Sequence, residues 1–476
     1  MIPAPHDATK WAQHTFGKAE LGDTRRAARL VDIAGRCAQN TGSSVASVCE
    51  GDGAMLEATY RFIRNDAVQP EVIRRAGFEQ TVACAQDIPE LLALEDTTSL
   101  SYKHQVASEL GKLGKPTDKA RGWWVHSVLL LNGQTMQTVG LVHQEWWCRP
   151  DNKDDADEKE SGKWRDASVF CRTRLSELMS RVISVCDREA DLFDYLMHKC
   201  DHGERFVVRG KHLRQVEESA QDLQSHLQDQ PVLGCYQLDI PQKGRLDKKG
   251  KRKNRSTRQA RLQVQSANVT FTRGREQLTL NAVWAQEISP PQGEEPLSWL
   301  LLTSEPVDTL AAALRVIRIY ATRWRVEDFH KAWKTGAGAE RQRMAEPDNL
   351  ERVVSILAFI GVRLLQLRES FTLPVYLKRL GLEREAEQVA TQPCDKVLSM
   401  DEWQVLVQMD SSTSLNKGQV PSLQWAYLAI ARLGGFTDSK RTGMAGWDTL
   451  WKGWERLQER VEGFMMAKEM MAAGKI

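Results

Sequence analysis

Apolar runs of four to eleven residues, each ended by polar residues, dominate the chain from about residue 91 to residue 210. Such runs, rich in Val, Leu, Ile and Trp, are typical of buried strands. A helical stretch, Ala190–Lys199, lies between two of them. Strands interleaved with helices predict a mixed α/β sheet. The predicted strands are Leu91–Glu95, Trp123–Leu131, Gln137–Trp147, Arg181–Cys186 and Arg205–Val208.

Residues 212–304 have another pattern, in which apolar and polar positions alternate between Gly- and Pro-containing turns. This period of two predicts half-buried strands. We therefore predict an all-β insertion inside the α/β domain, with strands at Cys235–Ile240, Leu262–Phe271 and Leu278–Trp284. Helical spacing returns at Val307 and predicts mostly helices to the end of the chain.

The first 70 residues also have helical periodicity. Apolar residues recur every three or four positions between Asp23, the expected N-cap, and Asn40, and a second helix is predicted over Ala54–Arg64. Both segments carry arginines. Two short basic helices are typical of a helix-turn-helix DNA reader, although an ordinary solvated helical subdomain has the same pattern.

The composition narrows the class of protein. Of 476 residues, 41% are apolar and 27% are charged, which predicts a folded protein of several domains. No stretch approaches the roughly 20 apolar residues of a membrane-spanning helix, and the first ten residues lack the apolar run of a signal peptide. Nine cysteines without a CxxC pair indicate reduced thiols. We therefore expect a cytoplasmic protein with no membrane partner.

Charge is balanced overall but uneven along the chain. The net charge of +2 excludes no partner, yet Lys248–Arg261 holds eight basic residues and no acidic one. This run is either a solvated hairpin tip or a loop that contacts phosphates.

The segment Tyr320–Lys334 combines charged and aromatic residues at helical spacing. On a regular helix of about 100° per residue, one stripe would contain Tyr320, Arg323, Glu327, Lys331 and Lys334, beside an apolar face of Ile319, Val326, Phe329 and Trp333. A solvated face with i,i+4 ion pairs would have this pattern. Alternatively, the carboxylate binds a metal ion and the cations hold nucleic-acid phosphates.

Two aspartates follow predicted buried strands. Asp96 comes after Leu91–Glu95, and Asp187 comes after Val182–Cys186. Either one alone is an ordinary turn former or helix N-cap. Together with Glu327 they would provide three carboxylates, which can bind two Mg²⁺ ions about 3.5–4 Å apart.

These residues resemble the signatures of the bacterial insertion-sequence-four transposases. Tyr320, Arg323, Glu327 and Lys334 have the spacing of that family's Tyr-Arg-Glu-Lys motif, and Asp96 in Glu-Asp-Thr-Thr and Asp187 in Cys-Asp-Arg-Glu-Ala-Asp resemble its two catalytic aspartates. The resemblance implies an RNase H-like core at 71–370 with a β insertion, an N-terminal helical end-binding domain at 1–70 and a C-terminal helical dimerisation domain at 371–476.

The resemblance also implies cut-and-paste transposition, in which DNA ends are nicked, closed as hairpins, reopened and joined to target DNA. Asp96, Asp187 and Glu327 would hold two Mg²⁺ or Mn²⁺ ions, and a homodimer would pair the two ends on the bacterial nucleoid. Trp299 would stabilise a flipped base. Terminal phosphates would be held by Tyr320, Arg323, Lys331, Lys334, Arg209 and Lys211, and end sequences read by Arg25, Arg26, Arg29 and Arg61.

Two other functions share parts of this pattern. A transposase-derived regulator would bind DNA ends without catalysis, and an RNase H-like nuclease would cut without specific ends. In the C-terminal region, Trp447, Trp451, Trp454, Leu457 and Val461 form an apolar stripe. The stripe fits either a partner helix or burial within one protomer.

Overall fold

The computed structural model describes residues 7–49, 51–114, 119–150, 160–240, 245–246, 252–253, 258–292, 294–410, 419–437 and 445–473. The chain divides into two compact units. The first comprises residues 1–236 and 262–366, and the second comprises residues 237–261 and 367–476. Most of the basic run Lys248–Arg261 lies outside the described residues.

The first unit begins with five helices: α1 (Ala8–Phe16), α2 (Thr24–Gln39), α3 (Val45–Val48), α4 (Gly53–Ile63) and α5 (Pro70–Ala85). Side chains cap α2 and α4: the carboxylate of Asp23, the predicted N-cap, accepts a hydrogen bond from Arg25 N, and the Asp52 carboxylate accepts one from Met55 N. The two helices predicted in this region correspond to α2 and α4, which contact each other.

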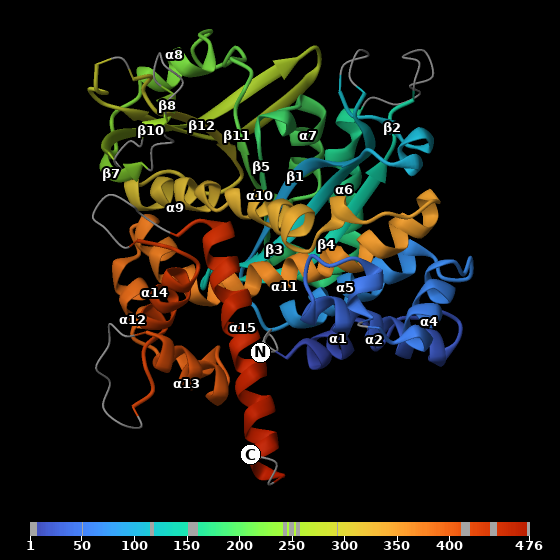
Figure 1. Cartoon of the computed structure of the whole chain (residues 1–476). Helices are drawn as coiled ribbons and strands as arrows, with labels where there is room; N and C mark the ends of the chain where they lie inside the picture. Colours follow the sequence, from blue (N-terminus) through green and yellow to red (C-terminus); the bar gives the residue numbers. More distant parts are fainter. Residues whose placement is uncertain are drawn as a thin grey trace. The chain divides into compact units, whose positions relative to one another are not determined.

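A mixed sheet forms the core of the first unit, with the strand order β2-β3-β1-β5-β6-β12-β11-β10-β7 and β4 beside β3 (Figure 1). β1 is parallel to β5, and β5 is parallel to β6, whereas the β1–β3, β6–β12, β12–β11 and β11–β10 pairs are antiparallel. The predicted mixed α/β class is therefore confirmed. The strands are β1 (Leu91–Tyr102), β2 (Gly111–Lys112), β3 (Arg121–Asn132), β4 (Thr138–Trp147), β5 (Val182–Cys186), β6 (Arg205–Arg209), β7 (Gly234–Ile240), β10 (Arg258–Arg273), β11 (Glu276–Glu287) and β12 (Ser298–Thr303).

Helices cover both faces of this sheet. On one face, α6 (Lys163–Leu175) and α7 (Phe193–Asp201) bury apolar side chains against β1, β5 and β6. On the other lie α9 (Leu310–Ala321) and α10 (Trp324–Lys331), followed by the start of α11 (Pro347–Arg379). The arrangement leaves α10 in contact with β1 and β3.

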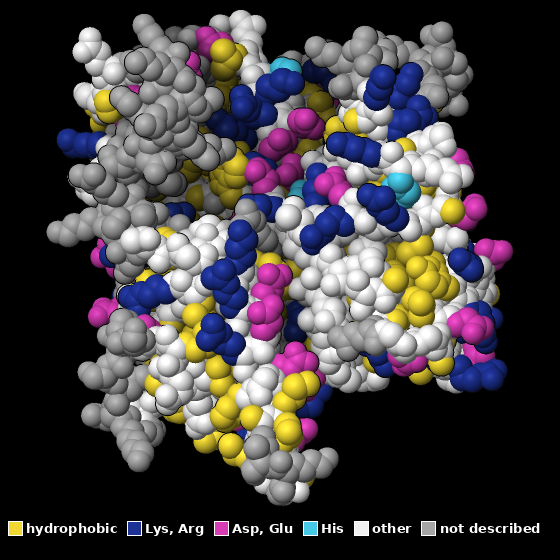
Figure 2. Space-filling view, viewed as in Figure 1, with side chains coloured by type: hydrophobic (Ala, Val, Ile, Leu, Met, Phe, Trp, Pro, Cys, Tyr) yellow, Lys and Arg dark blue, Asp and Glu magenta, His cyan; other side chains and the backbone are white. Residues whose placement is uncertain are grey.

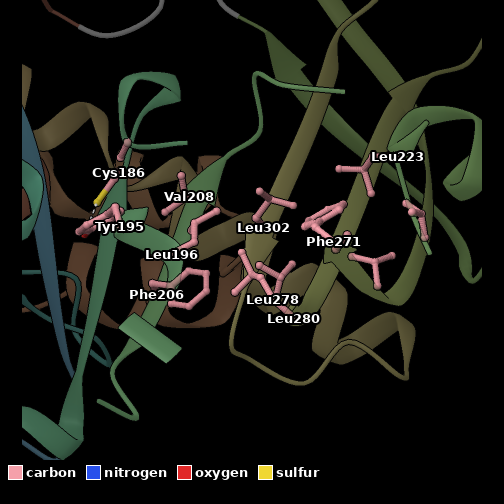
Figure 3. Close-up of a cluster of buried hydrophobic side chains, with 14 of the residues drawn as sticks. Cys186, Tyr195, Leu196, Phe206, Val208, Leu223, Phe271, Leu278, Leu280 and Leu302 are labelled. Atoms are coloured by element: carbon pink, nitrogen blue, oxygen red, sulfur yellow. Dashed lines mark hydrogen bonds between the residues drawn. The ribbon is translucent and has the colours of Figure 1, made fainter. Parts of the chain in front are cut away.

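The β insertion extends the core sheet. Its strand β12 pairs directly with β6, and its apolar residues share one cluster with α7 (Figure 3). In that cluster Phe271 and Leu280 of the insertion pack with Phe206 of the core. The insertion also contains one short helix, α8 (Leu223–Gln228), which the alternating pattern did not predict.

β1 is longer than its apolar run. The strand continues past Glu95 to Tyr102 because β3 pairs with it along its whole length. Asp96 therefore lies inside β1, opposite Ser127, and the prediction that it follows the strand is wrong. Asp96 lies just after the part of β1 that pairs with β5, because the last residue pair between these two strands is Leu94 with Val185.

The single helix predicted over Tyr320–Lys334 is interrupted. α9 ends at Ala321, α10 begins at Trp324, and a π-helical turn follows at Ala332–Gly336. The junction is tightened by hydrogen bonds to the third preceding residue, including Arg323 N to Tyr320 O and Arg325 N to Thr322 O. The apolar face is buried as predicted: Ile319, Val326, Phe329 and Trp333 are all at most 3% exposed.

The second unit is mainly helical, with α12 (Glu383–Ala390), α13 (Met400–Met409), α14 (Leu423–Leu433), α15 (Trp447–Ala472) and a small pair of strands, β8 (Arg245–Leu246) and β9 (Arg252–Lys253). Leu457 of the predicted C-terminal stripe is fully buried, and Trp454 and Val461 pack against the same core. Leu457 is thus buried within the protomer, and Trp454 and Val461 are half-buried against it. No helix in the described parts of either unit is long and apolar enough to cross a membrane.

Candidate active site

Asp96 and Asp187 are brought together by the register of two parallel strands. Leu91 pairs with Val182 and Leu94 with Val185. Asp96 and Asp187 each lie two residues beyond the pair of Leu94 with Val185. Because residues two apart in an extended strand share a face of the sheet, the two carboxylates are directed to the face covered by α10, where the Asp187 charge raises the Asp96 pKa.

Asp187 lies at the end of β5, as predicted. Its Oδ1 accepts a 2.8 Å hydrogen bond from the backbone N–H of Glu189, which starts the short 3₁₀ turn Arg188–Ala190. This contact occupies one oxygen. The residue remains half-exposed, so its carboxylate is accessible from the site.

The third carboxylate, Glu327, comes from the first turn of α10. Arg323 Nη2 donates a 2.6 Å hydrogen bond to Glu327 Oε1, and Arg323 Nη1 lies 3.8 Å from Asp96 Oδ2. The Arg323 side chain is only 10% exposed. The buried guanidinium therefore links the carboxylate on the helix to the one on β1.

The electrostatics of Asp96 indicate that the three carboxylates share one site. Its pKa is raised from 3.8 to about 7, mainly by burial and also by the nearby charges of Asp187 and Glu327, whereas Arg323 opposes the rise. The Arg323 pKa is raised despite burial, by Tyr320 and by the carboxylates of Asp96 and Glu327. A site with excess negative charge favours an added cation.

Three carboxylates form a hard oxygen donor set of the kind Mg²⁺ prefers. Within the described residues, no three Asp, Glu, His or Cys side chains are already arranged as metal ligands. The Glu327 carboxylate is instead hydrogen-bonded to Arg323. The donor set thus fits divalent ions, provided that the Glu327 carboxylate turns away from Arg323.

His330 is a neighbour that the sequence did not reveal. Its Nδ1 lies 3.8 Å from Asp96 Oδ2. Burial, together with the charges of Lys334, His126 and Arg323, lowers its pKa to about 3. The imidazole is therefore neutral at physiological pH and does not compensate the Asp96 charge.

Predicted DNA-binding residues extend the site along the sheet. Cys186 pairs with Val208, so the next residues in register are Asp187 and Arg209. On the other side of β6, Gly210 N donates to Leu300 O, which places Lys211 opposite Trp299. The Trp299 ring meets the Tyr320 ring edge-on with centroids 5.8 Å apart. Arg209 and Lys211 therefore lie at and just after the end of β6, next to the strand that carries Trp299, and Arg209 Nη2 donates a 3.4 Å hydrogen bond to Ser298 O.

The two lysines differ in environment. Lys334 lies in the π-helical turn, with Nζ 3.9 Å from Glu340 Oε1. Burial lowers its pKa, and Glu340 partly offsets the effect. Lys331 is exposed at the end of α10.

The N-terminal arginines fall into two groups. Arg25 and Arg61 are 91% and 75% exposed and make surface ion pairs with Asp23 and Glu57. Such pairs are weak and easily exchanged for a ligand. Arg26 donates to Leu21 O, and Arg29 to Asp32, so these two side chains already have partners within the domain.

Trp324 was missed by sequence reasoning. It is 57% exposed although it adjoins Arg323, whose guanidinium lies 5.4 Å from its ring centroid. An exposed indole can stack on a nucleobase. The signal was present in the sequence, because Trp324 falls outside both the charged stripe and the apolar face of the predicted helix.

Acidic and basic side chains gather on the face above α10 (Figure 2). Acidic groups lie near the middle of the upper half, with Lys and Arg on both sides. Basic side chains on both sides of the acidic ones suit a phosphate backbone that passes next to the carboxylates.

Two family models match the chain. A model described as Transposase DNA-binding matches residues 8–68. A model described as Transposase DDE domain matches residues 123–360, which is half of the chain. The first match covers helices α1 to α4, and the second contains Asp187, Glu327 and most of the sheet.

Proposed function

The chain belongs to the DDE transposase family, and we propose that it is a cut-and-paste transposase of the insertion-sequence-four group, similar to the transposon-five transposase. The family is a family of DNA enzymes with an RNase H-like core and divalent metal ions, generally Mg²⁺, so DNA is a partner of this chain. The finer assignment rests on the Tyr-Arg-Glu-Lys spacing from Tyr320 to Lys334.

The observation that carries the proposal is the meeting of Asp96, Asp187 and Glu327 beside Arg323. We assign the three carboxylates as the ligands of two Mg²⁺ ions, with Mn²⁺ as a substitute. When bound, such a pair activates the attacking water or 3′-OH and stabilises the leaving oxygen.

The other residues bind and orient DNA in this proposal. Arg209, Lys211, Tyr320, Arg323, Lys331 and Lys334 hold the terminal phosphates next to the carboxylates. Trp299 and Trp324 offer two indole faces to unstacked bases. This arrangement would support hairpin formation, in which the freed 3′-OH must reach the opposite strand.

End recognition is assigned to the N-terminal helices and pairing of ends to a homodimer. Arg25, Arg61, Arg26 and Arg29 lie on α2 and α4, where the exposed Arg25 and Arg61 are the more accessible. The dimer surface is assigned to the end of α15, where Phe464, Met465, Met466, Met470 and Met471 are 37–66% exposed.

An excision assay tests the proposed function. The substrate is DNA with both ends of the element that encodes this chain, incubated with Mg²⁺, with Mn²⁺ or with EDTA. Hairpin-ended excision in either metal but not in EDTA is the expected result. End binding without cleavage would instead identify a regulator, and cleavage independent of the ends would identify a nuclease.

A further inference from the structure

A buried carboxylate with no role in the proposed chemistry lies four residues after Asp187. Asp191 is fully buried. Its Oδ2 accepts hydrogen bonds from the backbone N–H groups of Lys211 and His212, at 2.6 and 2.8 Å, and its Oδ1 accepts one from Arg214. Arg214 also donates to the Asp191 backbone carbonyl. The carboxylate is thus fully engaged with one segment, residues 211–214.

These contacts join two segments that are separate in sequence. Asp191 ends the turn that begins at Asp187, and residues 211–214 follow β6, whose last residue is Arg209. The Lys211 side chain itself is exposed, although its backbone is held by Asp191. The Asp191 carboxylate therefore fixes the backbone that carries Lys211 relative to the turn that carries Asp187.

The segment is also anchored on its other side. Gly210 N donates to Leu300 O of β12. The Arg214 guanidinium lies 5.6 Å from the ring centroid of Phe271, in the insertion. Of these links the charged one is the strongest, because a carboxylate bound by two N–H groups and a guanidinium holds more firmly than a neutral acceptor.

Placing this carboxylate beside the site has an electrostatic cost. A third negative side chain in the turn that holds Asp187 and Glu189 opposes the approach of phosphate. Arg214 offsets that charge locally. The fixed position of residues 211–214 should therefore increase DNA affinity by more than the negative charge of Asp191 decreases it.

We propose that Asp191 is a positioning residue, which holds the 211–214 segment so that Lys211 meets a DNA phosphate next to Asp187. The inference rests on the proposed function. Asp191 touches neither DNA nor metal and acts through Lys211.

A double-mutant cycle on DNA binding tests the inference. Binding of wild type, Asp191→Asn, Lys211→Ala and the double variant to end DNA is measured in EDTA over a series of salt concentrations. Loss of one phosphate contact lowers the slope of log Kd against log salt by about one. We expect the slope to fall by about one in each single variant. In the double variant it should fall by no more than in Lys211→Ala alone.

The control is Glu189→Gln, which removes the same charge from the same turn. Glu189 is 64% exposed and pairs with Lys163. The Glu189→Gln variant should have the same slope of log Kd against log salt as wild type. If Asp191→Asn does not fold, as judged by its thermal transition, Arg214→Gln replaces it in the cycle because it removes the other half of the clamp.

Losses that add independently in the double variant would overturn the inference, as would an unchanged slope in Asp191→Asn. The proposed function is tested separately by the wild type. Wild-type protein that fails to bind ends would overturn both, whereas wild-type binding with additive losses would overturn this inference alone.

Discussion

The Arg323 guanidinium donates a 2.6 Å hydrogen bond to Glu327 and lies 3.8 Å from Asp96. A protein cation thus holds two of the three carboxylates to which metal binding is assigned. It limits the repulsion between these carboxylates, and under the proposed function it would become available to a DNA phosphate when metal binds them. Two experiments follow from this exchange.

The first concerns stability. Arg323→Gln should destabilise the metal-free protein by about 1.5–3 kcal/mol, because a hydrogen bond between charged groups is lost and the carboxylates repel. Added Mg²⁺ should restore more of the melting temperature in this variant than in wild type. Thermal melts with EDTA and with Mg²⁺ measure both effects. An equal Mg²⁺ gain in the two proteins would show that Arg323 and the metal do not share a site.

The second concerns pH. The Asp96 pKa is raised from 3.8 to about 7, mainly by burial, so below pH 4 the group is protonated in both the native and unfolded states. As the pH rises through 7 the native carboxylate ionises in an unfavourable site, and the stability associated with its protonated form is lost. Metal binds only the ionised form.

We therefore expect Mg²⁺ to bind about tenfold more weakly at pH 6 than at pH 8, as one proton competes with it. Calorimetric titration at the two pH values measures the difference. Asp96→Asn should bind Mg²⁺ weakly at both. Affinity that is independent of pH in wild type would contradict the role assigned to Asp96.

Trp299 should contribute more to hairpin formation than to first-strand nicking. Its ring lies against Tyr320 at the edge of the site. Trp299→Ala should slow hairpin formation by about 5- to 150-fold, which corresponds to a stacking loss of about 1–3 kcal/mol, while first-strand nicking changes little. Quenched-flow gels resolve the two products, and Trp299→Phe should restore part of the rate. Equal slowing of both steps would remove the base-stacking assignment.

The end of α15 should carry self-association. Met466 and Met470 are 59% and 45% exposed, and their replacement by Glu should prevent burial against a second copy. Light scattering of the end-bound protein should then report one protomer in place of two. Met400→Glu is a matched control, because Met400 is 67% exposed on α13. Persistence of the dimer in the double Glu variant would place the interface elsewhere.

The end of β5 could be predicted because apolar runs mark buried strands, and Asp187 follows such a run and lies where expected. Asp96 also follows an apolar run, but it lies inside β1, since β1 continues through polar residues for as long as β3 pairs with it. That pairing is a long-range property and leaves no local signal.

Contacts between segments that are distant in the sequence could not be predicted either. The predicted helix from Tyr320 breaks at Thr322, whose hydroxyl donates to Ile319 O, but its apolar face still followed from periodicity. In the sequence, Asp191 is only the last residue of the Cys-Asp-Arg-Glu-Ala-Asp motif. Its hydrogen bonds could not be predicted, because their donors lie 20 to 23 residues away. Trp324 differs from these cases, because its position outside the apolar face of the predicted helix already indicated an exposed side chain.

The most direct test of the account is cleavage and binding by Glu327→Gln, with Asp328→Asn as the neighbouring control. The amide keeps the size of the side chain and removes the charge that metal requires. We predict that Glu327→Gln binds paired ends with near wild-type affinity and yields no nicked, hairpin or excised DNA in Mg²⁺ or Mn²⁺, while Asp328→Asn cleaves. Cleavage by Glu327→Gln at the wild-type rate would contradict the assignment of Asp96, Asp187 and Glu327 as the catalytic centre.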